Sequence, residues 1–190
     1  MTGVSFDSDA QKTYNGEAQE IELKGTLPEQ IEGVTYKVTD VKDTSETPAK
    51  IDAINVGTYN IEASFTLKAE YADNYEVPTA IKGQFEITPK AVTVTAKPQT
   101  VVATGEVITA EALNQNEYTV DGTVKDEKLT VTLSLKEGTE YKEVGEYTEA
   151  IVPTVTAGNT LGNYAVTPVA GTLTISNLVN VDMTGITLED

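Results

Sequence analysis

The chain has 190 residues, of which 30 are acidic, 13 are basic and none is histidine or cysteine, so its formal net charge is −17. The lack of cysteine excludes disulfides and thiolate metal sites, and the lack of histidine excludes a Ser-His-Asp nucleophile. The negative charge disfavours nucleic acid as a partner, and no apolar run is long enough for insertion into a membrane.

Six stretches alternate apolar and polar residues with a period of two, which predicts β-strands with one buried face. Valine and threonine dominate these stretches, and β-branched side chains pack well on a pleated surface. Only the weak stretch 110–116 offers a helix, so we predict an all-β protein. The predicted strands are 34–38, 59–67, 85–87, 91–96, 129–135 and 171–175.

The second half of the chain repeats three motifs of the first half, in the same order and with nearly the same spacing. Val-Gly-Thr-Tyr (56–59), Asn-Tyr (74–75) and GQFEIT (83–88) recur as Val-Gly-Glu-Tyr (144–147), Asn-Tyr (163–164) and GTLTIS (171–176). We therefore predict two homologous modules, residues 1–89 and 90–176, with a linker too short for independent tumbling. The predicted architecture is two tandem Ig-like β-sandwiches that form an elongated rod. A β-grasp-like module is the alternative, and it would need a helix across the sheet.

The end of the chain resembles its beginning. Met-Thr-Gly at 183–185 repeats Met-Thr-Gly at 1–3, and apolar residues follow in both places. We predict that residues 177–190 are a linker and the first strand of a truncated third repeat. That strand would be disordered, extend along the second module, or pair with a neighbouring molecule.

Two residues of each repeat have predicted structural roles at the start of a strand. Gly57 and Gly145 precede strands where the chain turns, so we expect a positive φ or a close backbone approach there. Tyr59 and Tyr147 resemble the tyrosine corner of Ig-like sandwiches, in which the ring lies in the core and the hydroxyl binds nearby backbone.

The Asn-Tyr pairs have a predicted role near the end of each module. Asn74 and Asn163 suit a turn, and Tyr75 and Tyr164 are expected to anchor the last hairpin. Stacking of the repeated tyrosines on a ligand is the alternative.

The motifs of both modules have counterparts in a known family. The first module carries YNGEAQ (14–19), LPEQIEGVTY (27–36) and Val-Gly-Thr-Tyr, and the second ends on NYAVTPVAGTLTIS (163–176). In these stretches the sequence resembles the MBG-type repeats of bacterial cell-surface proteins. The second module resembles their Tyr-Gly (YGX) form, with Thr104 and Gly105 in place of that pair. The resemblance covers nearly all of residues 4–176 and implies a tandem array in an adhesin-like, cell-wall-attached protein without catalytic residues.

Carboxylates are the only candidate metal ligands in the sequence. Asp7, Asp9 and Asp182 lie at the repeated junction, and Ca²⁺ binds clusters of hard oxygen ligands. Their spacing follows no EF-hand pattern. We predict no catalytic residue and no cofactor, and calcium at this junction is the alternative.

The expected function is a structural spacer in the stalk of a bacterial cell-surface adhesin-like protein, which projects a distal binding domain. The chain would then be extracellular, attached to the cell wall through other regions, monomeric, and in contact with neighbouring repeats. The alternative is a module that itself binds a host glycan or protein. An exposed aromatic patch common to both modules would favour that alternative.

Overall fold

The computed structural model describes residues 3–157 and 161–177. This described part of the chain is all-β and sandwich-like, with 46% strand and 5% helix. The strands of the described residues are β1 (Gln11–Thr13), β2 (Ile31–Asp40), β3 (Gly57–Leu67), β4 (Ile81–Thr88), β5 (Lys90–Ala96), β6 (Gln99–Val102), β7 (Tyr118–Asp121), β8 (Thr130–Leu135), β9 (Gly145–Ala157), β10 (Tyr164–Val169) and β11 (Gly171–Ser176). The helices are single 3₁₀ turns, η1 (Ala69–Tyr71), η2 (Ala110–Ala112) and η3 (Leu161–Asn163).

The chain divides into two compact units. The first unit comprises residues 1–90 together with 124–127 and 159–165, and the second comprises the rest. The first unit therefore includes two segments from the second half of the sequence. The predicted modules, 1–89 and 90–176, differ from these units by those segments, and their number and limits stay a prediction. Except for residue 177, the predicted third-repeat segment lies outside the described residues.

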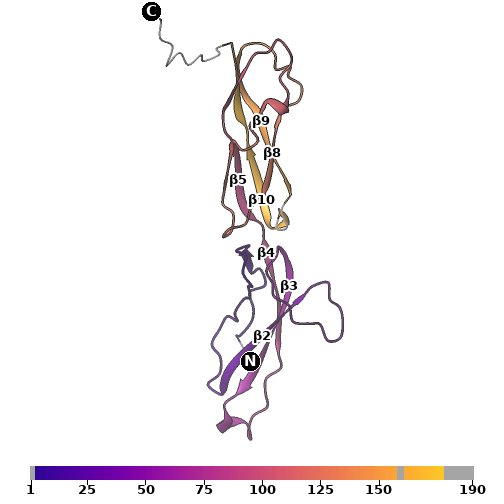
Figure 1. Ribbon diagram of the computed structural model, residues 1–190. Helices are drawn as coiled ribbons and strands as arrows, with labels where there is room; N and C mark the ends of the chain where they lie inside the picture. Colours follow the sequence, from indigo (N-terminus) through magenta and orange to yellow (C-terminus); the bar gives the residue numbers. More distant parts are fainter. Residues whose placement is uncertain (1–2, 158–160, 178–190) are drawn as a thin grey trace, which may run out of the picture. The chain divides into compact units, whose positions relative to one another are not determined.

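The first unit contains a four-stranded sheet in the order β1-β4-β3-β2 (Figure 1). β1 runs parallel to β4, and the other neighbouring strands are antiparallel. The segment that joins β2 to β3 extends away from the sheet as a long loop (Figure 1).

A second layer covers one face of this sheet. Phe6 and Leu23 pack against the buried cluster of Ile31, Ala63 and Phe65. Within the described part of this layer, the strand pairing is reduced to one antiparallel bridge, between Ser5 and Lys24, which neighbour Phe6 and Leu23 in the chain. The core of the first unit thus lies between a complete sheet and a largely irregular layer.

The second unit contains a four-stranded sheet in the order β6-β11-β9-β8 and a three-stranded sheet in the order β10-β5-β7. Side chains of β5 and β11 are buried at every second position, for example Val92 and Val94, or Leu173 and Ile175. This alternation is the one on which the strand predictions rest.

The two four-stranded sheets share one design. In both, a short first strand pairs in parallel with the last strand, which pairs with the long strand that begins at the repeated glycine. Tyr59 lies opposite Phe85, and Tyr147 lies opposite Leu173. The sequence repeat therefore corresponds to a structural repeat.

β9 differs from its counterpart β3 by a β-bulge. Gly171 lies opposite Ile151 and Leu173 lies opposite Tyr147, so three residues of β11 face five of β9. Within the bulge Glu149 has a φ of 54°, and the next two residues are both buried. The two extra residues of β9 interrupt the side-chain alternation at that point.

All six predicted strands are confirmed, although several are longer than predicted. The stretch 110–116 forms only η2, so it provides no helix that could cover a sheet, as a β-grasp module would require. Among the described residues, no helix is long and apolar enough to cross a membrane.

Candidate functional site

A polar cluster of the first unit joins two tyrosines through one carboxylate. Tyr14 directly follows β1, and its N–H donates to the carbonyl of Thr88 (2.9 Å). The Tyr14 hydroxyl donates to Oε1 of Glu127 (2.6 Å), and the Tyr164 hydroxyl donates to Oε2 (2.5 Å). The two rings meet edge to face with centroids 5.6 Å apart, an arrangement that aromatic quadrupoles favour.

Burial and the carboxylate both act on the phenols of this cluster. The pKa of Tyr14 is raised to about 12, first by burial and then by the hydrogen bond to Glu127. The pKa of Tyr164 is raised for the same two reasons in the same order. Both hydroxyls therefore stay protonated far above neutral pH and act as hydrogen-bond donors to the carboxylate.

A second pair of hydrogen bonds fixes the segment that contains Tyr164. The Val56 N–H donates to Oδ1 of Asn163 (2.8 Å), and Nδ2 of Asn163 donates to Oδ1 of Asn55 (2.8 Å). Asn163 is buried, and a buried amide is costly unless it is hydrogen-bonded.

The turn after β1 provides the other side of the cluster. The Glu17 N–H donates to Oδ1 of Asn15 (2.9 Å), which closes an Asx turn around Gly16. Gly16 has a φ of 74°, and a Cβ at this position would lie 2.8 Å from Cγ1 of Val124. Glycine is therefore required twice here, for the left-handed backbone and for the close contact.

The chemistry of this cluster is structural. Its hydroxyls and amides are used in contacts within the first unit, and the raised tyrosine pKa values disfavour a phenolate base or nucleophile. In the described part of the chain, no buried side-chain nitrogen or oxygen lacks a hydrogen-bond partner. The cluster holds segments 124–127 and 161–165 on the first unit.

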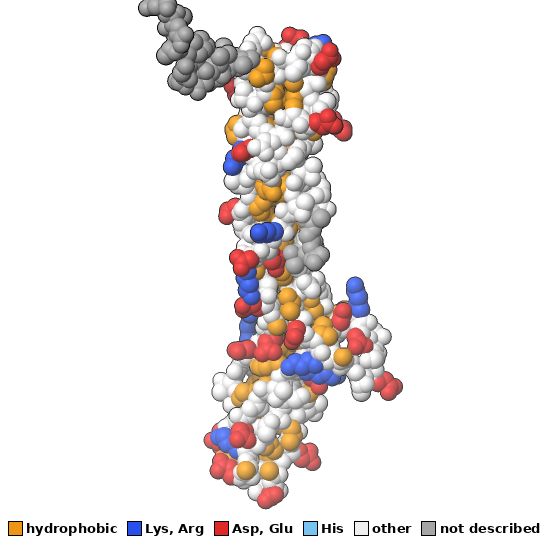
Figure 2. All heavy atoms as spheres, viewed as in Figure 1, with side chains coloured by type: hydrophobic (Ala, Val, Ile, Leu, Met, Phe, Trp, Pro, Cys, Tyr) orange, Lys and Arg blue, Asp and Glu red, His pale blue; other side chains and the backbone are white. Residues whose placement is uncertain are grey.

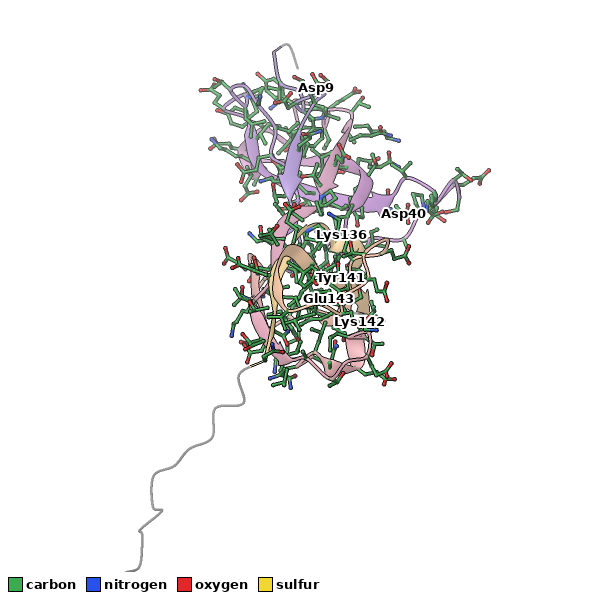
Figure 3. All side chains as sticks on the ribbon, turned by 90° about the horizontal axis from the view of Figure 1, so that it is seen from above. Asp9, Asp40, Lys136, Tyr141, Lys142 and Glu143 are labelled. Carbon is green, nitrogen blue, oxygen red and sulfur yellow. The ribbon has the colours of Figure 1, made fainter. Side chains whose placement is uncertain are left out.

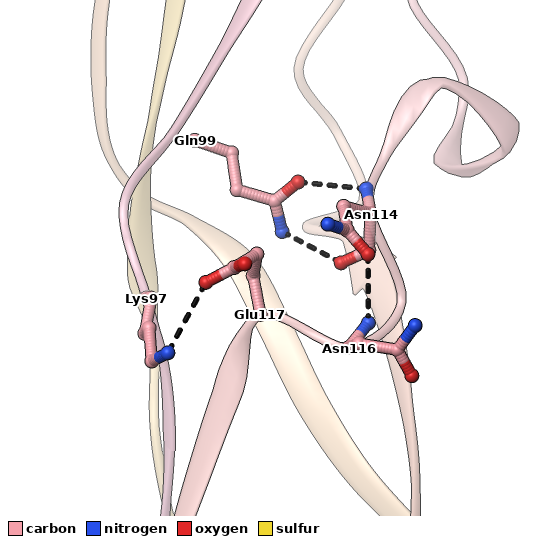
Figure 4. Close-up of polar contacts among 5 residues, drawn as sticks. All are labelled: Lys97, Gln99, Asn114, Asn116 and Glu117. Carbon is pink, nitrogen blue, oxygen red and sulfur yellow. Dashed lines mark hydrogen bonds and ion pairs between the residues drawn. The ribbon is translucent and has the colours of Figure 1, made fainter.

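A polar cluster of the second unit holds the loop before β7 (Figure 4). Oε1 of Gln99 accepts from the Asn114 N–H (2.8 Å), and Nε2 of Gln99 donates to the Asn114 carbonyl (3.2 Å). Lys97 and Glu117 form an ion pair across the same loop (3.2 Å). The side-chain amide of Gln99 thus makes the two hydrogen bonds that a neighbouring strand would make with Asn114. This cluster therefore also has a structural role.

The calcium candidates do not converge. Asp7 forms an ion pair with Lys24, which lowers the pKa of the Asp7 carboxyl, and Asp7 also accepts from the Asp9 N–H (3.3 Å). Asp9 lies at the surface of the first unit (Figure 3). Within residues 3–157 and 161–177, no three acidic side chains form a group that could hold a metal ion. Asp182 lies outside the described residues.

The tyrosine-corner hydrogen bonds are present in both halves. The Tyr59 hydroxyl donates to the carbonyl of Asn55 (2.7 Å), and the Tyr147 hydroxyl donates to the carbonyl of Glu143 (2.9 Å). The Tyr59 ring is buried in the core, as predicted, and it stacks on Phe85.

The ring of Tyr147 is only half-buried, and it meets Tyr141 edge to face with centroids 5.2 Å apart. The Tyr141 hydroxyl donates to the carbonyl of Lys136 (3.1 Å), and both residues are labelled in Figure 3. The second corner is therefore more open than its counterpart.

The expected reason for the glycines before these tyrosines holds at Gly57 and is wrong at Gly145. Gly57 has a positive φ of 158°, which residues with a Cβ rarely adopt, although the nearest atoms to a Cβ there would be ring atoms of Tyr59 at 3.7 Å. Gly145 has no positive φ, and a Cβ there would meet nothing within 4 Å. Backbone conformation therefore favours glycine at the first position only.

The two Asn-Tyr pairs have different environments. Tyr164 is buried in the cluster above, whereas Tyr75 is 52% exposed and contacts Tyr71 edge to face. Asn74 lies in the turn after η1, where its N–H donates to the Tyr71 carbonyl (3.1 Å). Tyr164 thus anchors its strand as expected, but the prediction is wrong for Tyr75.

The surface offers shallow, polar grooves. One groove of about 440 Å³ lies on the outer face of β2, β3 and β4, where Lys37, Glu62 and Lys82 line it. On the face drawn in Figure 2, acidic and basic side chains are scattered and do not form a region of one sign.

Sequence reasoning did not identify Glu127 or Tyr14 as site residues. No protein-family model matches the chain, and no curated protein and no solved structure is significantly similar to it.

Proposed function

We propose that this chain is a structural spacer, a repeat segment from the stalk of a bacterial cell-surface protein. The observation that carries the proposal is the structural repeat, in which the same four-strand order and the same glycine and tyrosine positions occur twice. Repeats that each bury their own core can be added in series without new chemistry. The sequence resemblance to MBG-type repeats points in the same direction and suggests an extracellular, wall-attached protein.

The distribution of exposed aromatic side chains favours the spacer over an adhesive module. A ligand-binding patch common to both halves would place exposed tyrosines at equivalent positions. Tyr75 is exposed, but its counterpart Tyr164 is buried and bonded to Glu127. The polar cluster of the first unit is likewise used internally.

Small-angle X-ray scattering of the purified chain tests the spacer function. A strand of ten residues spans about 33 Å, so modules arranged in series should give a particle much longer than it is wide. We expect a pair-distance distribution with a long tail, unchanged by addition of Ca²⁺ or EDTA. A compact, near-spherical particle would contradict the proposal.

Binding screens test the adhesive alternative separately. We expect no binding of the chain to glycan arrays or to immobilised extracellular-matrix proteins. Specific binding that is lost in Tyr75→Ala, with the fold unchanged, would replace the spacer proposal by an adhesive function.

A further inference from the structure

Two loops of the first half correspond to the two second-half segments that belong to the first unit. Residues 27–30 precede β2 as residues 124–127 precede β8. Asn74 and Tyr75 follow η1, and Asn163 and Tyr164 stand at the junction of η3 and β10. The chain therefore contains two copies of one loop pair.

The two copies differ in burial. In the second-half copy, Val124 is 8% exposed and Tyr164 is 7% exposed. In the first-half copy, Leu27 is 37%, Tyr75 52% and Val77 59% exposed. We call Leu27, Asn74, Tyr75 and Val77 the Tyr75 surface.

The loops of the Tyr75 surface lie next to each other. The Lys68 N–H donates to the carbonyl of Gln30 (2.9 Å), which joins the turn before β2 to the segment before η1. The Tyr75 N–H donates to the carbonyl of Tyr71 (3.0 Å). Because Ile31 also pairs with Leu67, both loops lie at the same end of the four-stranded sheet of the first unit.

The turn at Tyr14, against which the buried loops of the second half pack, also has a counterpart in the second unit. The Tyr14 N–H donates to the carbonyl of Thr88 (2.9 Å), and the Ala103 N–H donates to the carbonyl of Ser176 (3.0 Å). Tyr14 and Ala103 therefore occupy equivalent positions in the two sheets. The Glu106 N–H donates to Oγ1 of Thr104 (3.3 Å), as the Glu17 N–H donates to Oδ1 of Asn15. The second unit therefore repeats the receiving turn.

The receiving turn of the second unit is open. Gly105 has a φ of 83°, like Gly16, but a Cβ there would meet nothing within 4 Å, whereas one at Gly16 would meet Val124. Val144, the counterpart of Val56, is 52% exposed. We call Val102, Ala103, Gly105, Val107 and Val144 the Val144 surface.

The exposed apolar side chains gather on these two surfaces. Six of the eight large hydrophobic side chains that are exposed among the described residues belong to one or the other. The six are Leu27, Tyr75 and Val77 on the first surface and Val102, Val107 and Val144 on the second. Such gathering marks interaction sites, whereas single exposed valines need no explanation.

We propose that the Tyr75 surface binds the Val144 surface of a second copy of this chain. Asn74 takes the role of Asn163 and accepts from the Val144 N–H, and Tyr75 covers Ala103 and Gly105. The contact is heterologous, because two different surfaces meet, so it can propagate into open head-to-tail chains. This proposal replaces the monomer that the sequence suggests, and it does not depend on the spacer function.

Charge makes this contact weaker than its template within the first unit. Within the first unit, Glu17 forms an ion pair with Lys125 (3.1 Å). In the proposed contact Glu106 takes the position of Glu17, and Pro28 takes the position of Lys125, so this ion pair is lost. Glu29 and Glu143 add further negative charge to the two surfaces. Salt should therefore strengthen the association, because it screens this repulsion.

Sedimentation velocity of the 190-residue chain, from micromolar to millimolar concentration and at two salt concentrations, tests the proposal. We expect reversible growth into dimers and longer species, which increases with salt. Tyr75→Ser and Val144→Ser each change one surface and should raise the dissociation constant at least about tenfold, the effect of losing one anchor of an interface. Val41→Ser, at an exposed valine outside both surfaces, is the matched control and should change nothing.

Mixing the two variants tests the direction of the contact. Tyr75→Ser copies keep the Val144 surface, and Val144→Ser copies keep the Tyr75 surface, so the mixture should form one-to-one dimers and nothing longer. A chain that stays monomeric at millimolar concentration overturns the proposal. Association that survives both substitutions, or a mixture that grows beyond dimers, overturns it as well.

Discussion

The four-stranded sheets of the two units match, but the layers that face them do not. Among the described residues, the facing layer of the first unit has a single bridge, between Ser5 and Lys24, whereas the second unit has the three-stranded sheet β10-β5-β7. The equivalent glycines Gly83 and Gly171 show why. Gly83 lies against the ring of Phe6, and Gly171 lies against the carbonyl of Ala96 at the end of β5.

This difference separates what the repeat specifies from what it leaves open. The repeated residues define the order and register of one sheet in each half. A glycine in the same place admits an aromatic side chain in one unit and a strand backbone in the other. In the second unit the backbone of β5 lies against Gly171, and the facing layer is a regular sheet. In the first unit the Phe6 ring lies against Gly83, and the facing layer is irregular.

Substitution of the two glycines should give the largest effect. A Cβ at Gly171 would lie 2.6 Å from a backbone oxygen that cannot move alone, so we expect Gly171→Ala to cost about 3 kcal/mol of unfolding free energy, the upper end for overpacking. At Gly83 the Phe6 ring can adjust in part, and about 1–2 kcal/mol is expected. Urea unfolding followed by circular dichroism measures both. Equal losses of unfolding free energy in Gly171→Ala and Gly83→Ala would contradict this difference between the two facing layers.

Loss of the hydroxyls around Glu127 should come next. Tyr164→Phe removes the acceptor of the Val124 N–H (2.9 Å) and one donor to Glu127, so we expect a cost of about 2 kcal/mol. Tyr75→Phe, at the exposed counterpart, should change the unfolding free energy by less than about 0.5 kcal/mol. A similar loss in both variants would remove the distinction between the two loop pairs.

The same cluster should make stability depend on alkaline pH. Folding raises the pKa of Tyr14 from its ordinary value of 10.0 to about 12, so the unfolded chain loses its proton first. The stabilisation is complete below pH 10 and is lost as pH rises from 10 to about 12. Unfolding free energies measured across this range should fall less steeply in Tyr14→Phe than in the unchanged chain.

The tyrosine corners should give smaller effects. Tyr59→Phe and Tyr147→Phe each remove one hydrogen bond to a carbonyl, which is worth about 0.5–1.5 kcal/mol. Because Tyr59 is buried and Tyr147 is half-buried, the first substitution should cost more. Thermal unfolding of the two variants decides the order, and the reverse order would mean that burial does not govern the corner.

The bulge in β9 should give the smallest effect, and a favourable one. Glu149 has a φ of 54°, which strains a residue with a Cβ, so Glu149→Gly should raise the unfolding free energy by about 0.5 kcal/mol after the entropy cost of glycine. Glu62→Gly, in the regular strand β3, should lower it by a similar amount. Stabilisation by both changes would contradict a local strain at the bulge.

Much of the fold follows from the sequence, because alternation of valine and threonine with polar residues reports a half-buried strand directly. The strands that were not predicted lack this signal. All three residues of β1 are exposed, and β6 and β7 contain no buried residue. In β9 the bulge at Glu149 makes Ala150 and Ile151 both face inward, which hides the period of two.

The polar cluster was less accessible to sequence reasoning. Glu127 is one of 30 acidic residues, and what distinguishes it is its contacts with Tyr164 and with Tyr14, which lies 113 positions away. The same Asn-Tyr dipeptide occurs at Tyr75 and at Tyr164, but only Tyr164 is buried. Its burial depends on whether another segment covers it. Local pattern encodes the turn, and long-range packing determines the environment.

The parallel pairing of β1 with β4, and of β6 with β11, has a mechanical consequence. The start of one strand and the end of its parallel partner lie at opposite ends of the pair. Tension applied through these two points loads the inter-strand hydrogen bonds together, in shear, and does not peel them apart one by one. The second sheet, with four residue pairs in this ladder against three in the first, should therefore withstand the greater pulling force.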